Sequence, residues 1–352
     1  MKKNFTKTNI ILIIVLFLFS CKGSEDKTKI NIDLKKKEKE IMYSMFVDSL
    51  SYLELNTNDS CLVSDVSKIF IDNDTLILLD KKRGGVLIFS ETGKLVSQIN
   101  YYGRGPEEFI AITACNIDKV LNQIYILDWG NQKMLTYGYD GEFINSYHIH
   151  NFVKDFALLK ENKILCIHPY YDGGVNNGVW IEDREGNKAK HILDNVSEKD
   201  LFFFGGIYTN VSDDRVYYYD KNQDFLYSID QHSVQILYEF DLKQKIPIDE
   251  RIEADTDPQK AFGKSMVLSF NNSRDFILST CLTFGRPNSY NWVLLDKKKK
   301  KTLISDILIN DIDFIESSTH EIFYLQDNLW CRIINNEIEN CNLHLQFIHL
   351  PK

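Results

Sequence analysis

The sequence predicts an all-β protein: a six-bladed β-propeller with four-stranded antiparallel blades, in a ring closed by an N-terminal strand. Three observations support this prediction. The 352 residues include 22 Phe and 18 Tyr but only 17 Gly and 6 Pro, and a surplus of aromatic residues favours strands. A strand-like motif recurs at a regular spacing along the chain. The repeated region is long enough for six units, each with the length of a propeller blade.

The repeat is clearest in two tandem units that align without a gap. Residues 76–80 (LILLD) recur 48 residues later as residues 124–128 (IYILD), and the same offset aligns two further strand-like runs. Each unit contains a turn with a glycine, Gly93 or Gly141, because a tight hairpin needs a residue with positive φ. A third copy ends at Asp220, 92 residues after the second, and 92 is twice 46. One less regular unit therefore fits between the second and third copies.

Four strands in about 46 residues is the spacing of propeller blades. A β-sandwich would not repeat in register and the coils of a β-solenoid are shorter, so these alternatives fit less well. The strand-like residues 46–55 precede the first unit, and we expect them to pair with the last blade and so remove exposed sheet edges. The expected blades are residues 62–100, 110–150, 152–196, 202–242, 262–306 and 311–350.

The first 20 residues have the features of a lipoprotein signal peptide. Three lysines precede an apolar run of ten residues (10–19), which reaches about half of the ~30 Å hydrocarbon core and is too short to span it. The run ends in Leu-Phe-Ser-Cys, which resembles a bacterial lipobox. We expect Cys21 to carry diacylglycerol on its sulfur and a further chain such as palmitate on its amine, enough for stable anchoring. The alternative is a plain secretory signal.

Residues 21–40 are rich in Lys and Glu without apolar periodicity, which predicts a flexible tether before a propeller over residues 41–352. The acidic residues after Cys21 loosely resemble the surface-export signal of Bacteroidota lipoproteins. We therefore expect a protein that is lipid-anchored in the bacterial outer membrane and either exposed at the cell surface or facing the periplasm.

The chain is acidic, with a net charge of −9 that becomes −12 when a signal peptide with three lysines is removed. Such a chain lacks the cationic surface that binds nucleic acid, so we expect no nucleic-acid partner. The six cysteines after Cys21 are widely spaced and form no zinc pattern, which favours buried free thiols. Cys331 and Cys341 could form a disulfide across a hairpin with a three-residue loop, whereas a two-residue loop would place them on opposite faces.

Residues 103–109 (GRGPEEF) link the first two units. Two glycines and Pro106 predict a tight crossover, and we expect Phe109 to pack between blades. A phosphate loop is excluded because no Lys-Ser/Thr pair or helix follows. Together with the lipobox, residues 46–55 and the tandem units, this run resembles the signature of the six-bladed β-propeller lipoproteins of Bacteroidota, which are similar in shape to NHL-repeat propellers. The resemblance covers most of the chain after Cys21 and implies the fold, but no activity.

In a propeller, the loops after the second strands and the crossovers between blades lie at one end, where ligands usually bind. Aromatic rings there could stack on a ligand, and Asn or Arg could bind hydroxyls or carboxylates. Trp129, Tyr171 and Arg286 are the strongest candidates, although each could instead pack on its own loop. Arg104 could equally pair with Glu107 or Glu108. The candidate ligand-binding residues are Arg104, Trp129, Tyr170, Tyr171, Arg286 and Asn288.

The sequence indicates no catalytic residues. There is no G-x-S-x-G motif, and the eight His residues occupy no blade-repeated positions, so we expect no metal site and no cofactor. Residues 297–301 are five lysines, which predict a solvated hairpin tip or, alternatively, a contact for anionic glycan or lipid headgroups. Residues 242–262 do not fit the repeated strand pattern of the blades, which predicts an excursion from the sheets, a connecting segment with a short helix.

The expected function is that of a membrane-anchored binding or scaffold protein that captures a glycan, peptide or protein partner at the loop face of the ring. The alternative is a propeller enzyme, such as a metal-dependent hydrolase or lyase, that acts in the central channel.

Overall fold

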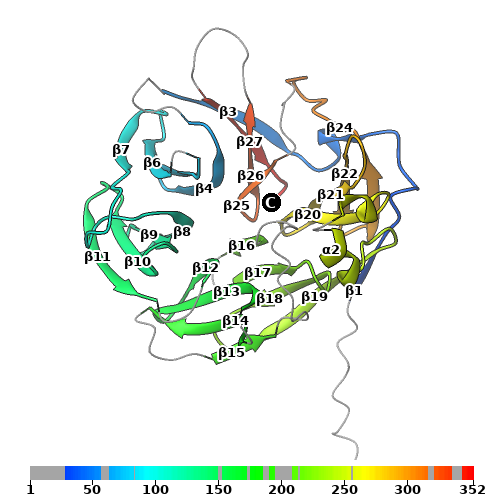
Figure 1. Ribbon diagram of the computed structural model, residues 1–352. Helices are drawn as coiled ribbons and strands as arrows, with labels where there is room; N and C mark the ends of the chain where they lie inside the picture. Colours follow the sequence, from blue (N-terminus) through cyan, green and yellow to red (C-terminus); the bar gives the residue numbers. More distant parts are fainter. Residues whose placement is uncertain are drawn as a thin grey trace, which may run out of the picture.

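The computed structural model describes residues 28–56, 63–82, 84–149, 153–172, 175–184, 190–194, 208–212, 215–254, 257–315, 321–334 and 343–352. Its strands form six antiparallel sheets arranged as the blades of a ring (Figure 1). The predicted six-bladed β-propeller with four-stranded blades is therefore confirmed.

The first three blades follow one another along the chain, and neighbouring strands in each blade are hydrogen-bonded. The first blade consists of β4 (Val66–Asp72), β5 (Thr75–Asp80), β6 (Gly85–Ser90) and β7 (Leu95–Ile99). The second consists of β8 (Ile112–Asp118), β9 (Gln123–Asp128), β10 (Lys133–Gly138) and β11 (Phe143–His148). The third consists of β12 (Asp155–Leu159), β13 (Lys163–Asp172), β14 (Val175–Asp183) and β15 (Lys190–Leu193).

The other three blades complete the ring. The fourth consists of β16 (Tyr208–Ser212), β17 (Arg215–Asp220), β18 (Phe225–Ile229) and β19 (Val234–Leu242). The fifth consists of β20 (Ser265–Asn272), β21 (Phe276–Thr283), β22 (Ser289–Asp296) and β23 (Lys301–Ser305). The sixth consists of β25 (Phe323–Gln326), β26 (Leu329–Ile334), β27 (Leu343–His349) and β3 (Ser49–Leu55).

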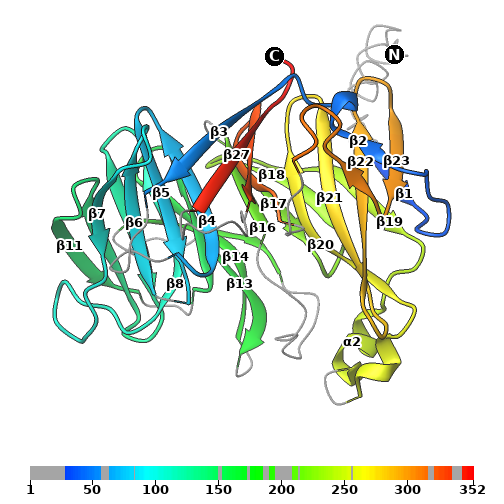
Figure 2. The same ribbon diagram turned by 90° about the horizontal axis from the view of Figure 1, so that it is seen from above.

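The sixth blade combines three strands from the C-terminal part of the chain with one strand, β3, from its N-terminal part. Its outermost strand β3 runs antiparallel to β27, with Leu55 opposite Leu343 and Ser49 opposite His349. Leu55 is fully buried, together with Leu345 of β27. Figure 2 shows β3 beside β27.

The N-terminal residues before β3 also join the ring. Strand β1 (Thr28–Ile32) pairs in parallel with β19 and is a fifth strand on the fourth blade. Strand β2 (Ile41–Met42) pairs with β24 (Leu308–Ile309). Residues 28–32 lie within the segment for which the sequence predicted a flexible tether. They form a strand because Ile30 and Ile32 enter the core between the fourth and fifth blades.

The middle strands are continuous apolar runs because the blades pack face to face. Ile77 of β5 belongs to the core between the first and second blades, whereas its neighbour Leu78 belongs to the core between the first and sixth. A middle strand therefore buries both of its faces, which requires apolar residues at consecutive positions. This packing explains the LILLD and IYILD runs of the repeat.

Short helices lie outside the sheets: η1 (Tyr43–Met45) before β3, then α2 (Ile248–Ala254) and η2 (Pro258–Ala261) between β19 and β20. The predicted excursion over residues 242–262 is thus confirmed. Buried Arg251 holds α2 on the fourth blade, because its guanidinium donates to the carbonyls of Ile246 (3.2 Å) and Lys221 (2.9 Å). Among the residues that the structure describes, no helix is long and apolar enough to cross a membrane.

Candidate functional site

The aspartates that end the second strands of the repeat have a structural role. Asp128 is fully buried, and its carboxylate accepts backbone N–H groups from Ile110 (3.0 Å), Ala111 (3.1 Å) and Gly130 (3.0 Å). Asp80 accepts the N–H of Ser64 at 2.7 Å in the same way. Each aspartate therefore ties the incoming crossover to a turn between middle strands. The repeated aspartate is visible in the sequence, but its structural role was not predicted.

The GRGPEEF crossover is a tight structural element, as the sequence predicted. The Glu108 carboxylate accepts the N–H of Gly105 at 2.8 Å, and the ammonium of Lys133 on β10 donates to the Gly105 carbonyl at 2.6 Å. Phe109 is fully buried in the core between the first and second blades. Arg104 is exposed, and no ion pair joins it to Glu108 or to Glu107, all three of which the structure describes.

The other predicted ligand-binding residues contact their own loops or neighbouring crossovers. The ammonium of Lys154 lies 3.9 Å from the ring centroid of Trp129, which is 43% exposed. The guanidinium of Arg286 lies over the Phe262 ring at 5.6 Å. The side-chain oxygen of Asn288 accepts the N–H of Gly285 at 3.0 Å. The convergence of these residues around one opening stays a prediction.

Some predictions concern residues that the structure describes incompletely or not at all. Tyr170 and Tyr171 lie on β13, where only their backbone is described. Cys21 and Cys341 lie outside the described residues, so the predicted acylation and the proposed disulfide stay predictions.

Charged side chains meet near the inner strands at the crossover end of the ring. Lys68 of β4 and Asp155 of β12 form an ion pair at 2.7 Å, which joins the first and third blades. Lys81 and Glu321 are exposed to solvent, yet burial lowers the pKa of Lys81 and raises that of Glu321. This end of the ring therefore contains an acid and a base whose pKa values are shifted towards neutrality.

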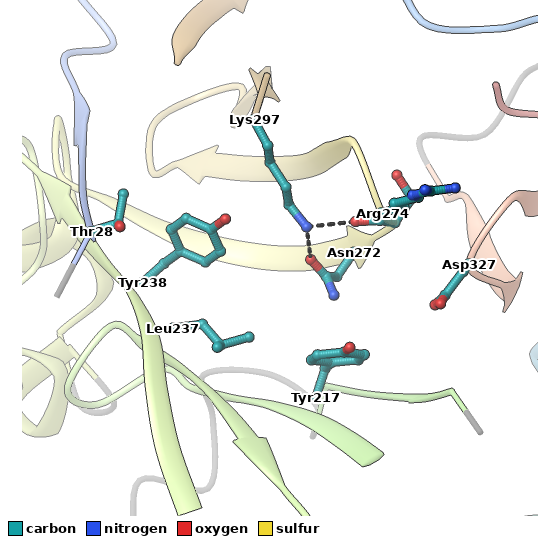
Figure 3. Close-up of a pocket in the computed structure, with 9 residues that line it drawn as sticks. Thr28, Tyr217, Leu237, Tyr238, Asn272, Arg274, Lys297 and Asp327 are labelled. Atoms are coloured by element: carbon teal, nitrogen blue, oxygen red, sulfur yellow. Dashed lines mark hydrogen bonds between the residues drawn. The ribbon is translucent and has the colours of Figure 1, made fainter. Parts of the chain in front are cut away.

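A pocket of about 360 Å³ lies at the opposite end, between the fourth and fifth blades (Figure 3). Arg274, Lys297 and Asp327 lie in turns after first or third strands, whereas Trp129 and Arg286 lie in turns after second strands. Successive strands of a blade run in opposite directions, so these two sets of turns lie at opposite ends of the ring. The pocket is lined by Thr28, Tyr217, Leu237, Tyr238, Asn272, Ser273, Arg274, Lys297 and Asp327.

A lysine ammonium is fixed in this pocket. Lys297 Nζ donates to Asn272 Oδ1 at 2.7 Å and to the Ser273 carbonyl at 2.5 Å, as Figure 3 shows. The same ammonium lies 5.8 Å from the ring centroid of Tyr238. Burial lowers the pKa of Lys297 to about 8, and the nearby carboxylate of Asp327 opposes this shift. Lys297 is therefore mostly protonated at neutral pH despite the cost of burying its charge.

The remaining walls of the pocket are aromatic and polar. Tyr217 and Tyr238 are half-buried on the fourth blade, and Asp327 on the sixth accepts the hydroxyl of Tyr324 at 2.7 Å. Such walls can hold a small ligand that has both an apolar face and polar groups. The lysine run predicted a solvated hairpin tip that included Lys297, so this site was not predicted from the sequence. The turn of the lysine run is indeed present between β22 and β23, but its first lysine points inward.

A second hollow of about 600 Å³ lies on the other side of the lysine turn. Its apolar lining includes Phe276, Leu294 and Leu303 of the fifth blade, and residues from the segment before β3 also line it: Glu38, Lys39, Glu40, Met42, Ser44 and Met45. Three lysines and three carboxylates line it, so its charges balance.

The described part of the chain contains no group of three His, Cys, Asp or Glu residues that could hold a metal ion. Cys115, Cys166 and Cys281 are buried free thiols, and Cys331 is buried as well. Burial raises the pKa of Cys281 to about 12, so this thiol stays protonated and unreactive at neutral pH.

Comparison with solved structures supports the fold. A Bacteroides fragilis protein that is described as exported is 16% identical, with a TM-score of 0.74 over 92% of this chain and 100% of that one. A member of the DUF4221 family from Bacteroides vulgatus is 11% identical, with a TM-score of 0.58 over 87% of this chain and 97% of that one. At these identities the similarity shows the fold alone.

A search of curated proteins gives no match to this chain. A family model does match residues 27–341, from the residue before β1 to the sixth blade, and it is described as a domain of unknown function. The chain therefore belongs to the DUF4934 family.

Proposed function

We propose that this protein is a membrane-anchored lipoprotein whose NHL-like propeller captures a glycan, peptide or protein partner. The observation that carries this proposal is the pocket between the fourth and fifth blades, where a fixed ammonium, two tyrosine rings and polar side chains surround about 360 Å³. Pockets of this size, with a few oriented polar groups, are typical of small-ligand sites. The bound group would be one sugar or amino-acid unit of the partner.

The anchor is supported by the lipobox at residues 18–21 and by the B. fragilis structural neighbour that is described as exported. Acylation at Cys21 would hold the protein at the bacterial outer membrane. To test this, cells that express the wild type or Cys21→Ser are labelled with an alkyne analogue of palmitate and fractionated. We expect label and membrane association with the wild type and with the matched control Cys61→Ser, but not with Cys21→Ser. Equal labelling of Cys21→Ser would contradict the proposal.

Ligand capture is tested by applying the full chain in detergent to glycan and peptide arrays. We expect Tyr238→Ala to lose binding, because Tyr238 forms a wall of the pocket. Trp129→Ala at the opposite end of the ring is the matched aromatic control and should bind normally. If only Trp129→Ala lost binding, the site would lie at the crossover end instead.

A second candidate function is hydrolysis or lyase chemistry in the central opening. It is favoured by the opposite pKa shifts of Lys81 and Glu321, because such shifts suit a general base and a general acid. An activity that is lost in both Lys81→Met and Glu321→Gln, but kept in Tyr238→Ala, would support it. An activity unaffected by either substitution would refute it.

A further inference from the structure

The half-buried ammonium of Lys297 forms no direct ion pair with a carboxylate within the described part of the chain. Its two hydrogen bonds go to neutral acceptors, the side-chain oxygen of Asn272 and the carbonyl of Ser273. The nearest carboxylates have other partners: Asp275 pairs with Lys298 at 2.6 Å, and Asp327 accepts the hydroxyl of Tyr324. Because no carboxylate bonds this partly desolvated ammonium directly, an anionic group that entered the pocket would be stabilised there.

The geometry leaves Lys297 able to bind such a group. An ammonium has three N–H donors and the two bonds use two of them, so one donor remains for a ligand. Figure 3 shows the ammonium at the side of the hollow that Tyr238 faces. Arg274 in the neighbouring turn is exposed at the rim and adds a second cation. The two cations outnumber the single carboxylate of the lining, Asp327, although the chain as a whole has a net charge of −9.

The remaining lining residues indicate which class of ligand would bear the anionic group. Leu237 is the one aliphatic side chain among the nine lining residues, whereas hydroxyl groups come from Thr28, Ser273 and two tyrosines. An aliphatic peptide side chain would find little aliphatic surface in this lining. A sugar ring presents several hydroxyls to polar walls and an apolar C–H face to a tyrosine ring.

We infer that the pocket binds an acidic sugar unit, with its carboxylate on Lys297 and its ring against Tyr238. The inference rests on the proposed function and specifies the ligand class of that site.

Isothermal titration calorimetry of the full chain in detergent tests the inference, with D-galacturonate and D-glucuronate as probes and D-galactose and D-glucose as their neutral counterparts. We expect a uronate to bind at pH 7 at least tenfold more tightly than the matching neutral sugar. Lys297→Met should weaken uronate binding at least tenfold. Lys300→Met, which removes an exposed lysine of the same turn, should leave it unchanged.

The pH dependence gives a measurement that needs no variant. Because the pKa of Lys297 is about 8, uronate binding by the wild type should weaken as the pH rises from 7 to 9.5. Equal binding of acidic and neutral sugars, or full uronate binding by a folded Lys297→Met variant, would overturn the inference.

Other outcomes separate this inference from the proposed function. If a tripeptide with a free carboxylate bound in a Tyr238-dependent way and no uronate did, the sugar class would be wrong and ligand capture would stand. If an array ligand that depends on Tyr238 were neutral, the role of Lys297 would be wrong. If no ligand depended on Tyr238, both proposals would fail.

Discussion

Replacing Asp128 with alanine should destabilise the propeller strongly although no apolar contact is removed. The Asp128 carboxylate is fully buried and accepts backbone N–H groups from the crossover and from its own turn, as well as the side-chain amide of Asn131 at 2.7 Å. In Asp128→Ala these donors lose their acceptor inside the protein. A donor left without a partner costs about 1–3 kcal/mol where it is buried. Ile110, Ala111 and Gly130 are exposed residues, so water can replace part of the lost acceptor. We expect a loss of about 3–5 kcal/mol in the free energy of unfolding.

Urea unfolding followed by tryptophan fluorescence measures this loss. Asp140→Ala is the matched control, because Asp140 lies in another hairpin turn of the same blade, is exposed, and accepts one backbone N–H from Glu142 at 3.0 Å. The control should cost less than about 1 kcal/mol. Equal stabilities for the two variants would refute the view that the repeated aspartates hold the crossovers to the turns.

Three further predictions concern the last blade, the pocket and the crossover end. Leu55→Ala should lower the free energy of unfolding by about 2–5 kcal/mol in thermal or urea unfolding, because Leu55 is fully buried on β3. Replacing the exposed Ser51 of the same strand with alanine should lower it by about 0.5 kcal/mol. Similar losses for both variants would contradict this prediction. The folded pKa of Lys297, about 8, lies below its usual 10.5, so the unfolded chain binds more protons between these values. The stability of the wild type relative to Lys297→Met should therefore rise from pH 8 to pH 10.5 and stay constant below pH 8. If the urea midpoint of the wild type fell relative to that of Lys297→Met between pH 8 and pH 10.5, Lys297 would not be buried as described. Trp129→Ala should lower the free energy of unfolding by at most about 1 kcal/mol, because the ring is 43% exposed and its contact with Lys154 is a surface cation–π pair. A larger loss in melting experiments would mean that this ring belongs to the core.

The fold was predictable from the sequence because the physical cause of the repeat is visible in single strands. A middle strand that buries both faces must be apolar at every position, so runs such as residues 76–79 stand out without any knowledge of their neighbours. The turns at Gly93 and Gly141 are equally local, since both glycines adopt positive φ. Strand β1 was missed because its two buried isoleucines alternate with exposed residues in a lysine-rich stretch.

The pocket was not predictable in this way. It combines Tyr217, Tyr238, Lys297 and Asp327, which belong to three blades and come together only through the pairing register and the packing of neighbouring sheets. In the lysine run, five identical residues have different surroundings: Lys297 is bonded inside the pocket, whereas Lys300 is exposed. The turn geometry that separates them is a tertiary property that residue type does not encode.

The start of β1 determines how the ring would be oriented towards a membrane. Thr28 lies at the edge of the pocket, and seven residue steps separate it from Cys21. A fully extended chain of this length reaches about 25 Å. With Cys21 acylated, as proposed, the end of the ring that contains the pocket would stay within that distance of the lipid surface, and the end with α2 and Trp129 would point away from it. A ligand would then reach the pocket through the narrow layer between the propeller and the bilayer. Long or bulky partners would be excluded from this layer unless they entered by a free end or were handed over by another protein in the same membrane.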